Sequence, residues 1–257
     1  MALLHVDFHS RALSRGVQMN VILPDALCDA PRPWRTLYLL HGMTDDYTIW
    51  QRRTAIERYA QDRNLAVIMP DARLSWYCDT AAGERFFSFI ADELPVLCRR
   101  MFPGLSHRRE DTFIAGLSMG GYGAFKCALK RPETFSRAAS LSGGLDALGM
   151  TRLDPPLADQ AYWADVFGPA EAIPGSENDL FAAAAELSAQ RPSLFMWCGT
   201  EDFLYNMNVS MRDHLRALGY DLRYSQGPGD HQWQYWDREI ENALKWMLDE
   251  GEAEECH

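Results

Sequence analysis

The sequence has little that would tie the chain to a membrane or to a disulfide framework. None of its apolar runs reaches the roughly 18 residues that a helix needs to cross a bilayer, so we expect no transmembrane helix. The first residues, MALLHVDF, lack the basic region and the apolar core of a secretory signal. The six cysteines are scattered, and none is paired as C-x-x-C or grouped with histidine at zinc spacing. These absences predict reduced thiols and a cytoplasmic protein.

Basic residues are also in short supply. The chain has 25 lysines and arginines against 36 aspartates and glutamates, which gives a formal net charge of −11. Because an acidic surface repels polyanions, we expect neither nucleic acid nor an anionic membrane as a partner. The sequence has no phosphate-binding loop, no dinucleotide fingerprint and no cluster of metal-ligating residues. It therefore predicts an activity that needs no cofactor and no metal.

Hydrophobic patterning predicts an α/β fold. Two alternating segments at 3–9 and 17–23 favour an antiparallel pair of strands at the N-terminal edge. From residue 36 onward short apolar strands alternate with helices, including one helical stretch from about 50 to 64, which indicates a mostly parallel sheet covered on both faces. Residues 145–190 lack regular alternation and contain several prolines and glycines. We interpret them as a cap-like insertion over the site, within a single domain spanning 1–257.

Residues 113–120, which read FIAGLSMG, are the most informative segment. An apolar run typical of a buried strand leads into the G-x-S-x-G pattern at 116–120, and a helical pattern follows at once. This context is that of a nucleophile elbow, in which the two glycines allow a tight turn that a β-carbon would obstruct. Ser118 is therefore the predicted nucleophile, at the N-terminus of the new helix.

A serine hydroxyl needs a base to take its proton, and the base needs an anion to orient it. In an open parallel sheet these groups lie at the carboxyl ends of strands, and Asp202 and His231 each follow a predicted strand. The order Ser118, Asp202, His231 is that of the α/β-hydrolases. Alternatives stay open: Asp202 as a helix N-cap with Glu201 as the acid, and His231 as an ordinary loop histidine.

The oxyanion formed on the attacked carbonyl needs two N–H donors. One is the backbone N–H of Met119, directly after the nucleophile. The second is expected from the loop after the third predicted strand, residues 41–44, which read HGMT. We assign this role to the N–H of Met43, with Gly42 as the alternative. The side chain of His41 is expected to pack the loop rather than act as a base.

These segments together resemble the esterase D-like group of α/β-hydrolases, and most of all its bacterial tributyrin esterases, which are small intracellular short-chain esterases. The similarity extends over about residues 5–248. The segments that carry it are 37–43 (LYLLHGM), 75–79 (SWYCD), 116–124 (GLSMGGYGA), 199–202 (GTED) and 229–233 (GDHQW).

The resemblance implies an α/β-hydrolase fold and the hydrolysis of short acyl esters, in some relatives acetyl or feruloyl esters on sugars. Ser118 would attack the ester carbonyl, His231 would accept its proton, and water would release the acyl group. The expected partner is a small-molecule ester; since related esterases are often oligomers, a homo-oligomer is expected too. Trp76 and Tyr77, in the loop after the fourth predicted strand, either wall the acyl or alcohol pocket or simply pack the loop.

Two other functions are compatible with these residues. A thioesterase of the S-formylglutathione hydrolase type uses nearly identical chemistry, although such relatives usually carry a different loop in place of HGM. A non-catalytic binding protein on the same scaffold is the alternative from another class. The intact set of Ser118, Asp202 and His231 argues against it. The sequence therefore predicts a serine carboxylesterase.

Overall fold

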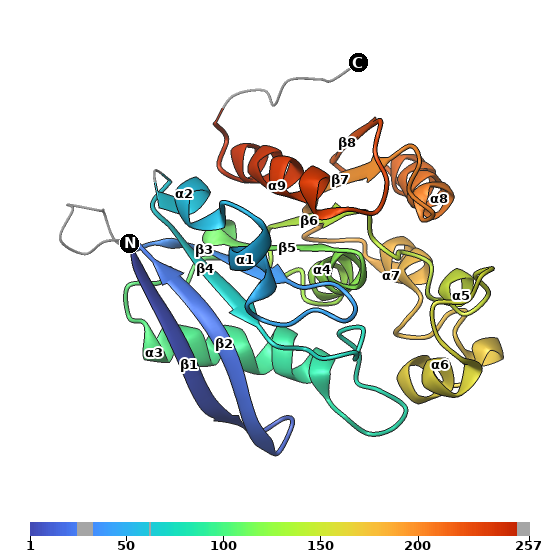
Figure 1. The fold of residues 1–257 in the computed structure, drawn as a ribbon, viewed down its shortest axis with the longest axis horizontal. Coiled ribbons are helices and arrows are strands. Elements are labelled where there is room, and N and C mark those ends of the chain that lie inside the picture. The colour runs from blue at the N-terminus through green and yellow to red at the C-terminus, as the bar shows by residue number, and fades with distance from the viewer. Residues whose placement is uncertain (25–32, 62, 251–257) are drawn as a thin grey trace.

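Eight strands form one sheet whose two N-terminal strands are antiparallel and whose remaining strands run parallel to one another (Figure 1). The computed structural model describes residues 1–24, 33–61 and 63–250. The strands are β1 (Ala2–Ser10), β2 (Arg15–Leu23), β3 (Arg35–Leu40), β4 (Leu65–Pro70), β5 (Thr112–Leu117), β6 (Arg137–Leu141), β7 (Ser193–Gly199) and β8 (Leu222–Gly227). Their order across the sheet is β1-β2-β4-β3-β5-β6-β7-β8. The predicted mostly parallel sheet with an antiparallel N-terminal edge is confirmed.

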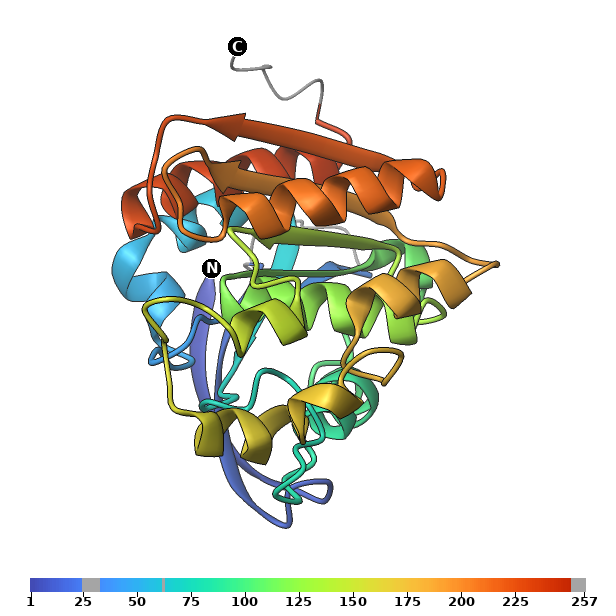
Figure 2. The ribbon, with the colours of Figure 1, turned by 90° about the vertical axis from the view of Figure 1, so that its right-hand side faces the viewer.

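Helices cover both faces of the sheet, as the two views of the ribbon show (Figures 1 and 2). Along β5 successive side chains point to opposite faces, so that Phe113 and Ala115 join one hydrophobic core and Ile114 joins the other. The helices of the first core are α1 (Ile49–Arg53), α2 (Ile56–Gln61) and α9 (Trp233–Met247); those of the second include α3 (Leu94–Met101), α4 (Met119–Lys130) and α8 (Tyr205–Ala217).

The expected single helical stretch from about 50 to 64 is wrong, because the chain breaks it at Thr54. The Thr54 backbone is extended, and its hydroxyl donates to the carbonyl of Trp50 at 2.5 Å. The same hydroxyl accepts the N–H of Ile56 at 3.3 Å, which begins α2. Threonine readily makes such local bonds to the backbone, and here they end one helix and start the next.

The segment between β6 and β7 is more regular than its sequence indicates. It contains α5 (Ala147–Met150), α6 (Gln160–Phe167), the 3₁₀ turn η3 (Ala170–Ala172) and α7 (Leu180–Glu186). Each α-helix begins behind an aspartate whose carboxylate accepts backbone N–H groups of the first turn, the usual N-cap arrangement. These capping residues are Asp146, Asp159 and Asp179.

Helix α4 anchors the segment between β6 and β7 through hydrogen bonds to Asn178. Tyr122 Oη donates to the carbonyl oxygen of Asn178 at 2.8 Å, and Lys126 Nζ donates to its Oδ1 at 2.5 Å. Lys126 is completely buried, and its Nζ also lies 3.1 Å from Cys78 Sγ and 5.2 Å from the centroid of the Phe87 ring. Since a buried ammonium is costly without partners, these contacts fix Asn178 on α4.

Glu93 anchors the turn between β1 and β2 through hydrogen bonds to its carboxylate. It ends the π-helical turn η1 (Ser88–Glu93) that precedes α3. Its carboxylate accepts the hydroxyl of Ser10 at 2.6 Å and the backbone N–H groups of Arg11 and Ala12 at 2.7 and 3.0 Å. Burial alone would raise the pKa of Glu93, but these three donors outweigh burial and lower it.

Within the described residues, no helix has both the length and the apolar character needed to cross a bilayer. The same residues bring together no group of three or more side chains suited to hold a metal ion. Four cysteines in this part of the chain are free and buried, in agreement with the expectation of reduced thiols: Cys78, Cys98, Cys127 and Cys198. Cys28 and Cys256 lie outside the described residues.

Candidate active site

Ser118 stands at a sharp turn between the central strand β5 and helix α4. Its backbone has φ 52° and ψ −118°, outside the regions that residues with a side chain favour. Strain of this kind is typical of a nucleophile elbow, which lifts a serine hydroxyl above the end of the sheet. Every residue of β5 is buried, whereas Ser118 is only half-buried. The turn therefore leaves the serine within reach of a substrate.

The tightness of this turn depends on Gly116 and Gly120. A β-carbon on Gly116 would collide with the backbone of Gly120, and one on Gly120 would stand 2.6 Å from the carbonyl oxygen of His41. The first contact closes the turn on itself. The second presses the start of α4 against the end of β3. The prediction that both positions have no room for a β-carbon is confirmed.

Asp202 and His231, which follow β7 and β8, are joined by a hydrogen bond of 2.8 Å between His231 Nδ1 and Asp202 Oδ2. The Asp202 side chain is completely buried, and that of His231 is 20% exposed. Asp202 Oδ1 accepts the N–H of Leu204 at 2.9 Å, so the carboxylate also shapes the turn before α8. Because an ionised carboxylate can only accept, Nδ1 carries the proton and Nε2 is left as the basic nitrogen.

The segment after β6 connects the serine to the histidine. The N–H of Gly144 donates to the carbonyl oxygen of Ser118 at 3.2 Å. Two residues earlier, the hydroxyl of Ser142 accepts the indole N–H of Trp236 at 3.2 Å. The Trp236 ring in turn packs edge-on against the His231 ring, with centroids 4.8 Å apart. Sequence patterns give no reason to single out Ser142, and Trp236 resembles any other apolar position of a helix.

Met43 lies in a β-turn at the end of β3. The turn is closed by the N–H of Asp45, which donates to the carbonyl of Gly42 at 3.3 Å, and Thr44 adopts φ 68° as its third residue. In a β-turn the N–H of the second residue takes no part in the closing bond. The N–H of Met43 is therefore left for another acceptor.

This β-turn packs against the elbow. A β-carbon on Gly42 would stand 2.6 Å from the side chain of Leu117, the residue before Ser118, and 3.1 Å from Asp45 Oδ2. Burial raises the pKa of the Asp45 carboxyl, because the charged form loses its water. On the other side of the elbow, the N–H of Met119 belongs to the first turn of α4, where N–H groups have no partner within the helix. Both proposed oxyanion donors thus lie on segments that pack against each other beside Ser118, where Gly42 meets Leu117.

His41 is buried, and both of its ring nitrogens are engaged by the backbone. Nδ1 donates to the carbonyl of Gly42 at 2.8 Å, and Nε2 accepts the N–H of Ala72 at 2.9 Å. This assignment follows from the Ala72 N–H, which can only donate. A ring held in this way packs the loop, as expected, and has no nitrogen left to serve as a base.

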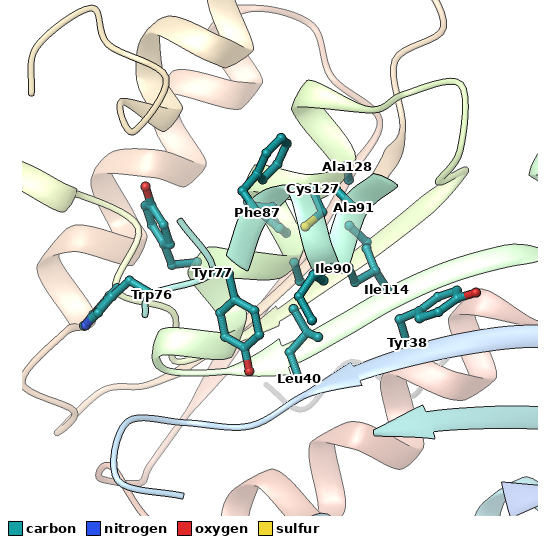
Figure 3. Close-up of a cluster of buried hydrophobic side chains, with 14 of the residues drawn as sticks. Tyr38, Leu40, Trp76, Tyr77, Phe87, Ile90, Ala91, Ile114, Cys127 and Ala128 are labelled. Carbon is teal, nitrogen blue, oxygen red and sulfur yellow. The ribbon is translucent and has the colours of Figure 1, made fainter. Parts of the chain in front are cut away.

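Trp76 and Tyr77 belong to the buried hydrophobic cluster, where they are 1% and 0% exposed (Figure 3). Both adopt positive φ, 52° and 54°. Tyr77 Oη donates to the carbonyl of His41 at 2.9 Å, and the Trp76 indole N–H donates to Tyr162 Oη at 3.1 Å. A β-carbon on Gly144 would stand 2.8 Å from the Trp76 ring. The two side chains therefore pack behind the nucleophile turn instead of opening to solvent.

Trp76 also links the site to the predicted insertion. Its ring makes edge-on contacts with the rings of Trp163 and Phe167 on α6, with centroids 5.4 and 5.7 Å apart, and with Tyr122 on α4 at 5.7 Å. Such aromatic contacts have a defined geometry and favour one arrangement of the rings. The position of α6 is therefore coupled to the loop that lies behind Ser118.

Similarity to known proteins covers nearly the whole chain. The sequence model of the family described as "Putative esterase" matches residues 10–247. An acetyl esterase of Caldicellulosiruptor saccharolyticus is 32% identical over 262 residues, which are 96% of this chain and 98% of that protein.

Two structures from Staphylococcus aureus are similar throughout. FphF, a fluorophosphonate-binding serine hydrolase, superposes with a TM-score of 0.88 at 35% identity. An S-formylglutathione hydrolase, FrmB, superposes with a TM-score of 0.85 at 36% identity. Each alignment covers 96% of this chain and 98% of the other. The predicted α/β-hydrolase fold is thereby confirmed.

Proposed function

The chain belongs to this esterase family, and from that membership we propose that it is a serine carboxylesterase that hydrolyses short-chain acyl esters through an acyl-enzyme on Ser118. The observation that carries the proposal is the 2.8 Å bond between His231 Nδ1 and Asp202 Oδ2. It supports a base with a fixed tautomer at the edge of the sheet where Ser118 stands, which is what a serine hydroxyl needs in order to react.

In the proposed cycle, Ser118 Oγ attacks the ester carbonyl while His231 Nε2 takes the hydroxyl proton and Asp202 stabilises the imidazolium. The N–H groups of Met43 and Met119 bind the oxyanion that develops on the carbonyl oxygen. His231 then gives its proton to the leaving alcohol. Water, activated by the same base, releases the acid and restores the serine.

We propose acetate and other short acyl groups as the substrates. A relative that is 32% identical is described as an acetyl esterase, and the tributyrin esterase resemblance extends the range to butyrate. The segment 145–190 would cap the acyl pocket, and Trp76 and Tyr77, which are buried, would support that pocket from behind the nucleophile turn. Acetyl and feruloyl esters of carbohydrates stay candidate natural substrates. A homo-oligomeric state and a cytoplasmic location also stay predictions.

A thioesterase is the second candidate. It is favoured by the 36% identity to a structure described as an S-formylglutathione hydrolase. The same three side chains would serve it, with the thiol of glutathione leaving in place of an alcohol. The two functions therefore differ in the leaving group and in the surface that binds it, and they share the acyl-enzyme step.

The test is a turnover panel on the purified protein. It includes p-nitrophenyl acetate, butyrate and octanoate, an acetylated xylo-oligosaccharide, methyl ferulate and S-formylglutathione, with Ser118→Ala as the control. We expect the highest kcat/KM on acetate or butyrate and no turnover by Ser118→Ala. A dominant rate on S-formylglutathione would establish the thioesterase instead. Unchanged turnover by Ser118→Ala would show that the nucleophile lies elsewhere.

A further inference from the structure

Glu201, the neighbour of Asp202, holds both backbone polar groups of Gly229, two residues before His231. The N–H of Glu201 donates to the carbonyl of Gly229 at 3.0 Å, and Glu201 Oε2 accepts the N–H of Gly229 at 2.5 Å. Thr200 Oγ1 donates to the other carboxylate oxygen at 2.7 Å. The bond from Thr200, followed by that from Gly229, lowers the pKa of Glu201. The carboxylate is therefore ionised near neutral pH, and its bonds are charge-assisted.

The loop that carries His231 is bonded to the loop after β7 at Gly227 as well, because the Gly227 carbonyl accepts the N–H of Thr200 at 2.9 Å. It leaves β8 through Gly227, Pro228 and Gly229, and Gly229 adopts φ 156°. A β-carbon on Gly199 would collide with the carbonyl of Gly229, so the two loops meet backbone to backbone. Glycine loses more conformational freedom on ordering than any other residue, so such a loop needs specific bonds to stay in one conformation.

We propose that Glu201 is a positioning residue, which fixes the loop of the base so that His231 Nδ1 meets Asp202 in the geometry that proton transfer requires. The inference rests on the proposed function. Glu201 does not face the reacting atoms: its side chain is exposed and lines an open groove of about 690 Å³ together with Gly229 and Trp233. It acts through the peptide of Gly229. A small displacement of a catalytic group is enough to lower a rate substantially.

The same exposure makes the inference testable without loss of the fold. Removing the Glu201 carboxylate empties no part of either hydrophobic core, because the side chain is exposed and belongs to neither. Glutamine keeps a carbonyl oxygen that can accept the N–H of Gly229, whereas alanine does not. A matched control is Glu133→Ala. Glu133 is exposed and lies beyond Lys130, the end of α4 opposite to Ser118.

The experiment compares Glu201→Ala, Glu201→Gln and Glu133→Ala with the wild type. Turnover of p-nitrophenyl acetate is measured, together with the NMR resonance of the His231 Nδ1 proton. We expect Glu201→Ala to lower kcat by about 10-fold with KM changed less than about 2-fold, since one charge-assisted hydrogen bond is lost. Its Nδ1 proton resonance should broaden or shift. The kcat of Glu201→Gln should stay within about 3-fold of that of the wild type. The kcat of Glu133→Ala should equal that of the wild type.

Two results would overturn the inference. One is a Glu201→Ala protein whose kcat and Nδ1 resonance equal those of Glu133→Ala. The other is a Glu201→Gln protein as impaired as Glu201→Ala, which would point to charge rather than to the bond with Gly229. The resonance reports the bond between His231 and Asp202 directly. It therefore tests the role of Glu201 even if the wild type hydrolyses no ester, an outcome that would count against the proposed function alone.

Discussion

Gly120 and His41 meet backbone to backbone: a β-carbon on Gly120 would stand 2.6 Å from the carbonyl oxygen of His41. This contact holds the first turn of α4 against the end of β3. Through it, the segment that presents Ser118 and the turn that contains Met43 keep a fixed separation. The distance between the two proposed oxyanion donors therefore depends on a position that has no side chain.

Gly120→Ala should disturb both the fold and the site. The added methyl group must displace the backbone of β3 or of α4, and overpacking of this kind costs about 1–3 kcal/mol of unfolding free energy. We also expect kcat/KM to fall by about 10-fold or more, because an oxyanion donor moves. Urea denaturation and esterase kinetics measure the two effects. Gly16→Ala is the control, since nothing lies within 4 Å of a β-carbon there; equal behaviour of both variants would refute the prediction.

Met43→Pro should remove one oxyanion donor without removing the turn. Proline lacks the N–H, and it is favoured at the second position of a β-turn, where Met43 stands. We expect kcat to fall by about 100-fold and the melting temperature to change little. A variant that keeps full activity would assign the donor to Gly42 instead. Met43→Leu, which keeps the N–H, serves as the control.

Asp202→Asn should impair catalysis while the protein stays folded. The amide oxygen can still accept the N–H of Leu204, so the turn before α8 is preserved. The amide NH₂ would face His231 Nδ1 and favour the tautomer in which Nε2 carries the proton and cannot accept another. We expect kcat to fall by about 10³–10⁴-fold. Asp230 is an exposed neighbour of the histidine, and Asp230→Asn should leave kcat nearly unchanged. If Asp230→Asn lowers kcat and Asp202→Asn does not, Asp230 is the acid that orients His231.

Glu93→Gln should destabilise the protein in a pH-dependent way. The pKa of Glu93 is lowered in the folded state, so its carboxylate contributes stability above the unfolded pKa of about 4.3 and loses that contribution as the pH falls through the folded value. At pH 7 the variant should lose about 1–2 kcal/mol of unfolding free energy. The difference from the wild type should narrow below about pH 4. Urea denaturation at pH 7 and below about pH 4 measures the unfolding free energy of the variant and the wild type, with Glu133→Gln as the control. A loss of unfolding free energy that is the same at both pH values would contradict the mechanism.

The features that could be predicted from sequence are those carried by short local patterns. The strand before Ser118, the glycines around it and the strand ends before Asp202 and His231 are each readable within about ten residues. The bond between Asp202 and His231 brings together two residues that were singled out separately. The parallel arrangement of the strands from β3 onward follows from their alternation with helices, whereas the placement of β4 between β2 and β3 does not.

The contacts that could not be predicted join segments far apart in the chain. Nothing near Trp236 indicates that its indole N–H bonds Ser142, and nothing near Glu201 indicates that its carboxylate binds Gly229. The helices between β6 and β7 are a different case. Asp146, Asp159 and Asp179 are ordinary N-cap residues, and their signal was present in the sequence but outweighed by the surrounding prolines and glycines.

The anchoring of Asn178 on α4 has a consequence for how substrate range can change in this protein. Both of its bonds come from Tyr122 and Lys126, on the helix that begins directly after the nucleophile. The stretch of chain before Asn178 is thus attached twice, by these two bonds and by the ring contacts that Trp163 and Phe167 on α6 make with Trp76. We therefore expect that changes of substrate range which leave the residues at the end of the sheet in place also retain Asn178 and these ring contacts.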